Sequence, residues 1–298
     1  MNLPYSRFAT TTEVQTAAFR CLNQELNRLN LAYALADYSE TNAERFPWSD
    51  GMLGTPAFYA ARLWEYPFAL SAAELTPGMT VADVGCGMTP FTVYLQECAG
   101  CEVTGVDPDR FEYGFKCGAF GVSQEFLTRT GLRVLRGDMR ALPLESDSQD
   151  RVFCLSVMEH VPPPVARLGM QEFARVLRPG GRAIVTLDLS MWLELNRPLD
   201  LVWDSGLMLL PPIDLRWPPT RFGRLERHGR AADVLGLTLV KDDTPIATEY
   251  SDDGHPVATL PAFRIPTLIP RREYPPPPLW QRVARRIRRH LRRSGARP

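Results

Sequence analysis

The sequence lacks any apolar run that approaches the roughly 18 residues needed by a membrane-spanning helix. Its N-terminus also lacks the basic-then-apolar layout of a secretory signal peptide. These absences argue against an integral membrane or secreted protein, and we expect a cytoplasmic one. The 45% hydrophobic and 23% charged content of the 298 residues is that of an ordinary soluble chain, and no internal repeat is present.

Paired metal-ligand motifs are missing as well. Cys98 and Cys101 form a CxxC, but the chain has no second CxxC and no His pair to complete a zinc site. The six cysteines stand at positions 21, 86, 98, 101, 117 and 154. We therefore expect core thiols in a reducing compartment and no metal ligands.

Charge is unevenly distributed along the chain. Residues 271–298 hold ten Arg and one Glu, so they sum to +9, and the other 270 residues must sum to −9 for a net charge of zero. Residues 275–278 are all Pro and predict a polyproline II spacer. Beyond them, apolar residues recur at helical spacing among seven arginines: Leu279, Trp280, Val283, Ile287 and Leu291. Such a helix is typical of peripheral contact with anionic membranes, while docking on the acidic body of the chain and RNA binding stay open.

One glycine-rich stretch organises the rest of the sequence. Residues 80–84 are β-formers, Gly85 and Gly87 follow, and Pro90 opens a helix-like run. Strand, glycine loop and helix together form a nucleotide-binding turn in which backbone and ligand approach closely. A dinucleotide fingerprint needs glycine where Pro90 stands, and the Tyr-x-x-x-Lys pair of many dehydrogenases is absent.

Strand-like and helix-like runs alternate after this stretch. We predict strands at 80–84, 102–106, 132–136, 151–157 and 182–188, and helices near 91–98, 109–127 and 164–177. This alternation indicates parallel strands whose carboxyl ends carry the ligand site. Asp83, Asp107, Asp138 and Ser156 all fall at predicted carboxyl ends and should converge there.

Four segments, in order, resemble the class I S-adenosylmethionine-dependent methyltransferases, most nearly the type 11 group. They are residues 83–87 (the D/E-x-G-x-G loop), residues 103–107 (the strand that ends in a ribose-binding acid), residues 137–139 and residues 173–182. The resemblance covers about residues 75 to 190. It implies a Rossmann-like, doubly wound α/β fold with a seven-stranded sheet, mostly parallel with the last strand antiparallel, and an N-terminal helical extension.

The resemblance and the chemistry of S-adenosylmethionine assign cofactor-binding roles. Asp83 suits the ammonium group, the backbone N–H groups of Gly85 and Gly87 suit the carboxylate or ribose edge, and Asp107 suits both ribose hydroxyls. Asp138 and the Met139 N–H suit the adenine. The full expected set is Tyr66, Asp83, Gly85, Cys86, Gly87, Asp107, Pro108, Asp138, Met139 and Ser156. For Asp83, Asp107 and Asp138, loop-capping or ordinary turn roles stay open.

Catalysis is expected from the segment after the fourth strand. His160 has a reference pKa suited to proton removal near neutral pH, and it stands beside Glu159. Some relatives carry Glu-x-x-Glu-His here and bind a divalent metal, whereas this chain has Ser156 at the first position, so we expect no metal. A capping or packing role for His160 stays open.

The remaining segments complete the expected domains. Residues 1–75 form an N-terminal helical extension, with a capping box at Thr10-x-x-Glu13, a helix to about Ala36, and an apolar run at 58–70 from which Tyr66 closes the methionine end. The methyltransferase domain spans 76–270. Within it, 189–228 are an aromatic, proline-rich insertion that we assign to a substrate lid. A helix at 221–235 and strands at 237–241 and 257–265 follow, and the two strands form the antiparallel pair that closes the sheet. Residues 271–298 form the spacer and basic tail.

We therefore expect a methyltransferase that uses S-adenosylmethionine to methylate a small-molecule or lipid-linked acceptor, at oxygen. Nucleic-acid bases are not expected, because Asn-Pro-Pro-Tyr-type and Pro-Cys loop motifs are absent. Two alternatives from other classes stay open: a cofactor-binding scaffold without catalysis, and an NAD-dependent oxidoreductase.

Overall fold

The parallel strands predicted from the sequence form the centre of one mixed sheet. A computed structural model describes residues 5–33, 61–108, 122, 124–188, 200–203, 205–215, 224–225, 230–231, 234–242, 248–250 and 256–258. All of them lie in the compact unit Met1–Leu268. The parallel strands are β2 (Thr80–Val84), β3 (Glu102–Asp107), β4 (Arg133–Arg136), β5 (Gln149–Leu155) and β6 (Leu177–Asp188).

The order of these strands is that of a doubly wound fold. They are hydrogen-bonded in the order β4-β3-β2-β5-β6, and each neighbouring pair is parallel. β11 (Val234–Val240) continues the sheet antiparallel to β6 over seven residue pairs. Because the order reverses direction beside β2, the carboxyl ends of β2, β3 and β5 lie together at the position where such folds bind ligands.

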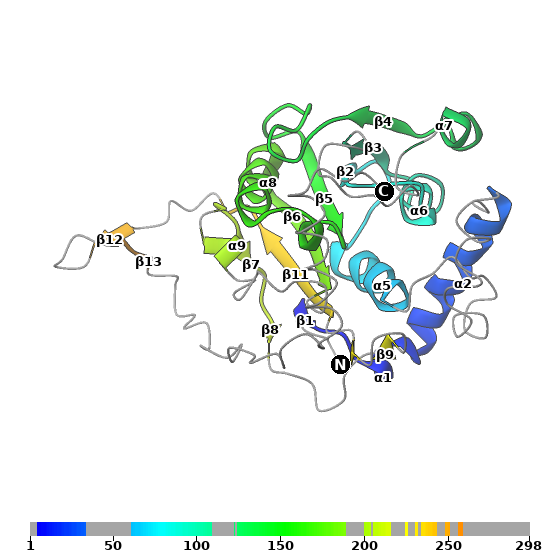
Figure 1. Ribbon diagram of the computed structural model, residues 1–298, viewed down its shortest axis with the longest axis horizontal. Helices are drawn as coiled ribbons and strands as arrows, with labels where there is room; N and C mark the ends of the chain where they lie inside the picture. Colours follow the sequence, from blue (N-terminus) through cyan, green and yellow to red (C-terminus); the bar gives the residue numbers. More distant parts are fainter. Residues whose placement is uncertain are drawn as a thin grey trace, which may run out of the picture. The chain divides into compact units, whose positions relative to one another are not determined.

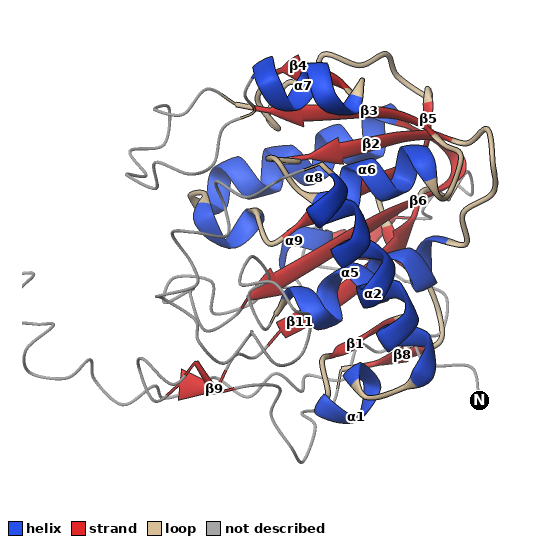
Figure 2. Cartoon of the chain, turned by 90° about the vertical axis from the view of Figure 1, so that its right-hand side faces the viewer, coloured by secondary structure: helices blue, strands red, loops and turns tan. Residues whose placement is uncertain are grey.

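Helices cover both faces of this sheet (Figures 1 and 2). One face carries α2 (Ala17–Ala32), α5 (Arg62–Ala73) and α6 (Pro90–Glu97), whose buried residues share a core with β2 and β5. The other carries α8 (Pro163–Val176) and α9 (Asp200–Trp203). The short α1 (Thr11–Val14), α7 (Gln124–Thr130) and the 3-10 helix η2 (Met158–His160) complete the helices of the described residues.

The strand that pairs with β11 comes from the N-terminal part of the chain, whereas we predicted a strand from the C-terminal part. β1 (Ser6–Phe8) pairs antiparallel with β11, and β8 (Ile213–Asp214) pairs parallel with β1. β7 (Met208–Leu209) also pairs with β11, so nine strands of the described residues join this sheet where we expected seven. The predicted last strand is not among them: β13 (Pro256–Ala258) pairs with β12 (Thr248–Tyr250) in a separate two-stranded sheet, and 259–265 lie outside the described residues.

The predicted helix at 221–235 is also wrong. Its described residues are extended: β9 (Arg224–Leu225) pairs with β10 (Arg230–Ala231), and β11 begins at Val234. The single helix predicted after Thr10 is two helices. Thr10 caps α1 through the Glu13 N–H as expected, but the Thr16 side chain accepts from the Phe19 N–H and starts α2 anew.

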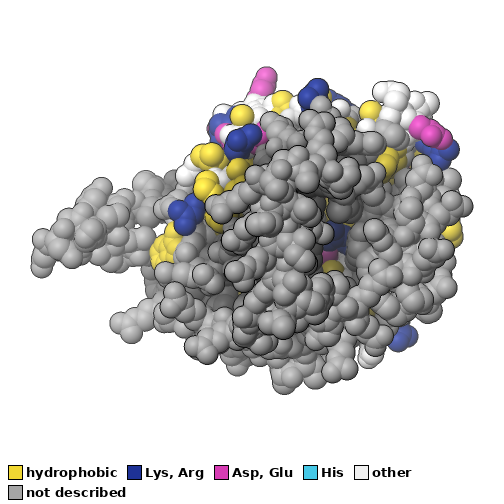
Figure 3. Space-filling model, in the orientation of Figure 1, with side chains coloured by type: hydrophobic (Ala, Val, Ile, Leu, Met, Phe, Trp, Pro, Cys, Tyr) yellow, Lys and Arg dark blue, Asp and Glu magenta, His cyan; other side chains and the backbone are white. Residues whose placement is uncertain are grey.

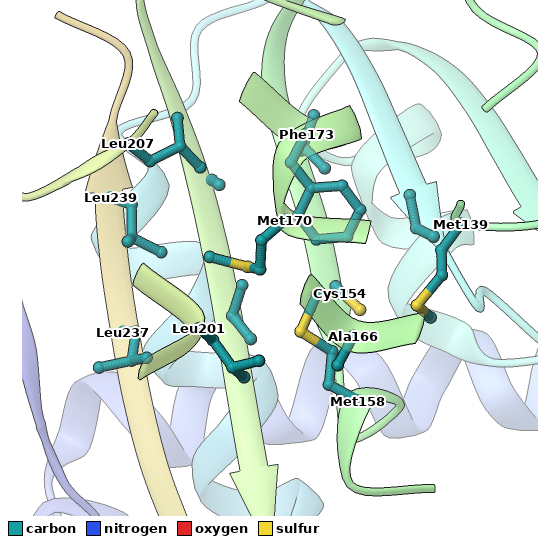
Figure 4. Packing of buried hydrophobic residues seen from close by; sticks show 14 of the residues in the cluster. Met139, Cys154, Met158, Ala166, Met170, Phe173, Leu201, Leu207, Leu237 and Leu239 are labelled. Atoms are coloured by element: carbon teal, nitrogen blue, oxygen red, sulfur yellow. The ribbon is translucent and has the colours of Figure 1, made fainter. Parts of the chain in front are cut away.

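Part of the aromatic insertion belongs to the core. Leu201 and Leu207 pack against Leu237 and Leu239 of β11 (Figure 4), and their exposed fractions do not exceed 4%. Burial of such side chains contributes about 1.5–3 kcal/mol each. Residues 189–199 and 216–223 of this insertion lie outside the described residues. Among the described residues, no helix combines the length and apolar character needed to cross a membrane.

Candidate cofactor site

The glycine loop is packed between two strands. Gly85 and Gly87 have φ angles of +75° and +52°, a left-handed conformation that favours glycine. The Gly85 N–H donates to the Val106 carbonyl at 2.7 Å, and a Cβ on Gly85 would lie 2.5 Å from Cγ2 of Val157. The loop is therefore fixed against β3 on one side and the segment after β5 on the other.

Asp107 ends β3 beside this loop. Its Oδ2 accepts a 2.9 Å hydrogen bond from the Gly87 N–H, and burial raises the pKa of Asp107 to about 6. Pro108 follows and is half-buried. The Cys86 side chain is buried against Gly105, where an added Cβ would lie 2.7 Å from Sγ, so the loop can offer a ligand only the backbone of Cys86.

Asp83 lies deeper, at the carboxyl end of β2. It is 4% exposed, and its Oδ2 accepts a 2.7 Å hydrogen bond from Thr92 Oγ1 in the first turn of α6. Burial, with a smaller contribution from the charge on Asp107, raises the pKa of Asp83 to about 7. Asp83 and Asp107 thus form an acidic pair close enough to interact.

Asp138 follows β4, and its carboxylate already accepts hydrogen bonds from a neighbouring residue of the chain. Its Oδ1 accepts from the Arg140 N–H at 2.8 Å and its Oδ2 from Arg140 Nε at 2.9 Å, a local turn with an ion pair. The Met139 side chain is buried in the core near Gly169 (Figure 4). The structure therefore places these two residues at the predicted edge, with Asp138 in the turn role that the sequence had left open.

A buried polar network joins β5 and β6 to α5. Ser156, with φ +55°, hydrogen-bonds through Oγ to Glu159 Oε1 at 2.5 Å, and its N–H donates to Thr186 Oγ1 at 3.1 Å. Thr186 Oγ1 in turn donates to Glu65 Oε1 at 2.9 Å, and Glu65 is ion-paired with Arg62. Burial, followed by the charge of Glu65, raises the pKa of Glu159 to about 8, so Glu159 is protonated at neutral pH.

Tyr66 connects this network to the glycine loop. It is 5% exposed, shares a side-chain hydrogen bond with Thr89, and packs on Phe91 with ring centroids 5.1 Å apart. Burial raises the pKa of Tyr66 to about 12, so the phenol keeps its proton. Its hydroxyl therefore provides a neutral polar group beside the N-terminus of α6.

His160 ends η2, just beyond Glu159. Its N–H donates to the Val157 carbonyl at 2.9 Å and its side chain is half-buried, whereas Glu159 is 3% exposed. Of the two predicted catalytic residues, His160 is thus the more accessible. The described residues contain no group of three or more His, Cys, Asp or Glu placed to hold a metal ion.

Sequence reasoning missed the polar residues of α5 and β6. Arg62, Glu65 and Thr186 carry no motif, and Glu65 and Thr186 stand 121 positions apart. The one local signal was the Arg-x-x-Glu spacing at 62–65, which also suits an ordinary surface pair. The face in Figure 3 shows a hollow near its centre in which basic and acidic atoms are visible.

The donor set suits S-adenosylmethionine. Carboxylates at the ends of β2 and β3 can accept from an ammonium group and from ribose hydroxyls, and the left-handed glycines allow a ligand close to the backbone between them. Because Asp83 is buried and Asp107 half-buried, and no ion pair joins either to a cation of the described residues, a cationic ligand would stabilise their charged forms.

Comparison with known proteins agrees with this fit. Residues 82–185 match the family model described as a methyltransferase domain. An uncharacterized methyltransferase of Mycobacteroides abscessus is 40% identical over 39% of this chain and 41% of its own length. Methyltransferase GfsG of Streptomyces halstedii is 33% identical over 65% of each chain. Sterol 24-C-methyltransferase ERG6B of Gibberella zeae is 30% identical over 36% of this chain and 27% of its own.

The chain thus spans less than two thirds of each of these relatives. The matched residues run from β2 through most of β6 and include the glycine loop, Asp107 and His160. Residues 82–185 therefore carry a methyltransferase domain, and this match together with the donor set indicates S-adenosylmethionine as the cofactor.

Proposed function

We propose that this protein transfers a methyl group to a small-molecule or lipid-linked acceptor, at oxygen. The observation that carries the proposal is the fixed position of the Asp107 carboxylate beside the glycine loop, through the Gly87 N–H. When bound, S-adenosylmethionine supplies an activated methyl group. The protein then has mainly to hold the two partners in line and to exclude water.

Each residue has a proposed part in this reaction. Asp107 binds the ribose hydroxyls, Asp83 the ammonium group, and Tyr66 closes the methionine end. Asp138 and Met139 border the adenine through the turn after β4. Pro108 and Ser156 line the site at the ends of their strands.

His160 is the proposed general base. It is half-buried next to Glu159, which is protonated at neutral pH and so adds no charge beside the imidazole. A neutral His160 can accept the proton of an acceptor hydroxyl, and this step is what an oxygen acceptor requires. Glu159 Oε1 accepts a 2.5 Å hydrogen bond from Ser156 Oγ, and this bond holds the short helix that carries His160 in place.

An apolar acceptor is supported by one relative and by the sequence of the tail. The Gibberella zeae relative is named a sterol 24-C-methyltransferase, so it supports the apolar class of acceptor and not the oxygen assignment. Seven arginines between 282 and 293 would bring the protein to an anionic membrane surface, where lipid-type acceptors reside. The aromatic insertion at 189–228 would then serve as the lid.

The experiment supplies methyl-tritiated S-adenosylmethionine and a lipid extract to the purified full-length protein. Label should enter an extract component, and mass spectrometry should locate the new methyl group on oxygen. A product methylated at carbon would refute the oxygen assignment while keeping the transferase. The absence of transfer to any lipid or metabolite fraction, with S-adenosylhomocysteine still bound, would favour a binding protein without catalysis.

A further inference from the structure

Arg62 occupies an unusual position for a cation. It is the first residue of α5, and its guanidinium is ion-paired with Glu65 one turn later. Its Cζ lies 5.7 Å from the centroid of the Tyr66 ring. Only 16% of its side chain is exposed, whereas the Glu65 side chain is fully buried. Because a carboxylate and an aromatic ring both contact this nearly buried guanidinium, its orientation is restricted.

This cation lies at the edge of an acidic site. The Tyr66 ring beside its guanidinium packs on Phe91 at the start of α6, and its partner Glu65 is joined through Thr186 to the Ser156 N–H after β5. Arg62 therefore lies near the glycine loop and near the segment after β5, and its charge accordingly lowers the pKa values of Tyr66 and Glu159 against the larger effect of burial. The titratable groups around it are mainly acids: Glu65 on its own helix, Asp83 beyond Tyr66, and Glu159 after β5. Arg62 therefore supplies positive charge where the described residues are otherwise acidic.

The cofactor needs such a group. S-adenosylmethionine carries a sulfonium, an ammonium and one carboxylate, and that carboxylate is repelled by Asp83 and Asp107 in their ionised forms. The sequence had assigned it to the N–H groups of Gly85 and Gly87. In the structure those groups donate to the Val106 carbonyl and to Asp107.

We propose that Arg62 binds the carboxylate of the cofactor's methionine end. A guanidinium carries five donors in a planar fork, so an ion pair with one carboxylate does not use up its capacity to bind a second. This inference rests on the proposed function and identifies the residue that binds the carboxylate at the amino-acid end of the cofactor.

Glu65 is the positioning residue for this contact. Its Oε2 holds the guanidinium while its Oε1 accepts from Thr186 Oγ1 at 2.9 Å, and Thr186 is fixed on β6 by the Ser156 N–H. The chain Ser156–Thr186–Glu65 therefore anchors Arg62 to the sheet. Loss of the Glu65 charge should loosen Arg62 without removing it.

The test compares two ligands that differ only in the carboxylate. Calorimetry on the full-length protein measures S-adenosylhomocysteine and S-adenosyl-3-thiopropylamine, which lacks that group. Arg62→Gln should weaken S-adenosylhomocysteine about 10- to 100-fold, the range for a charge-assisted bond, and leave the decarboxylated ligand within about twofold. Arg62→Lys should lose less, because it keeps the charge. Glu65→Gln should change the ratio of the two affinities in the same direction by a smaller factor.

Arg28 provides a matched control. It is also ion-paired with a glutamate three residues away, Glu25, but on the exposed face of α2. Arg28→Gln should change neither affinity. Equal losses for both ligands in Arg62→Gln and Arg62→Lys would assign Arg62 to the fold alone, and no loss for either would also overturn the proposal. Failure of the wild-type protein to bind S-adenosylhomocysteine would contradict the proposed function itself.

Discussion

The Gly87 N–H donates a 2.9 Å hydrogen bond to Oδ2 of Asp107. This bond joins the loop after β2 to the end of β3, 20 residues later in the chain. It orients the carboxylate before any ligand arrives, so less conformational freedom remains to be lost on binding.

Removing this carboxylate tests its role. Asp107→Ala should weaken S-adenosylhomocysteine by about 1.5–3 kcal/mol, because hydrogen bonds to a charged group are lost. Calorimetry measures the change, with Asp150→Ala as control, since Asp150 pairs with Arg178 at the opposite ends of the strands. An unchanged dissociation constant in a folded Asp107→Ala protein would show that Asp107 does not bind the ribose.

The packing of the glycine loop gives a prediction for stability. Gly85→Ala should lower the free energy of unfolding by about 1–2 kcal/mol for the left-handed backbone, plus about 1–3 kcal/mol for the contact with Val157. Gly180 is a matched control, because its φ is +74° but nothing lies within 4 Å of an added Cβ. Urea denaturation should therefore show a larger loss for Gly85→Ala than for Gly180→Ala, and equal losses would contradict this packing.

The buried Glu159 predicts a pH dependence. Its pKa is raised to about 8 from an unfolded value near 4.5, so the folded state binds the extra proton. The stability it contributes is complete below about pH 4.5 and is lost as pH rises through about 8, at up to about 1.4 kcal/mol per pH unit. Glu159→Gln should flatten the fall in unfolding free energy between pH 6 and pH 8.5, whereas Glu145→Gln on an exposed turn should leave it as in wild type. Parallel curves for all three proteins would refute the assignment.

His160→Ala tests the proposed base once an acceptor is known. Turnover should fall about 10²-fold or more, since a general base of this kind contributes that much, while cofactor affinity stays within about twofold. Steady-state kinetics and calorimetry separate the two effects. Full turnover in His160→Ala would reduce His160 to a capping or packing role.

The basic tail predicts a salt-sensitive membrane contact. Removal of residues 275–298 should abolish sedimentation with anionic vesicles at low salt, because each arginine near such a surface contributes about 1 kcal/mol. Neutral vesicles serve as the control, and S-adenosylhomocysteine binding should be unchanged. Full-length protein that stays in the supernatant with anionic vesicles would refute membrane contact.

Local patterns predicted the centre of this fold well. The strand at 80–84 has the predicted bounds, and Asp107 ends its strand as expected, because strand, glycine loop and helix signals are contiguous in the sequence. β1 could not be predicted in the same way. It is three residues long, and its partner Gly236 stands more than 200 residues away, so tertiary pairing rather than local preference makes it a strand.

The residues of the candidate site show the same difference between local and long-range signals. Asp83 lies in β2 and Asp107 ends β3, so local strand patterns predict where they stand. Arg62 and Thr186, in contrast, are connected only through Glu65 in the folded chain. The predicted helix at 221–235 was wrong because the residues from Val234 onward pair with β6, a long-range contact that no local sequence pattern indicates.

We expect the carboxyl edge of β2 and β3 to bind S-adenosylmethionine and not a nicotinamide cofactor. The most direct test of this expectation is a calorimetric titration of the full-length protein with S-adenosylhomocysteine and, separately, with NAD. We predict saturable binding of S-adenosylhomocysteine at one site per chain and no heat of binding with NAD. Saturable binding of NAD without binding of S-adenosylhomocysteine would contradict the account.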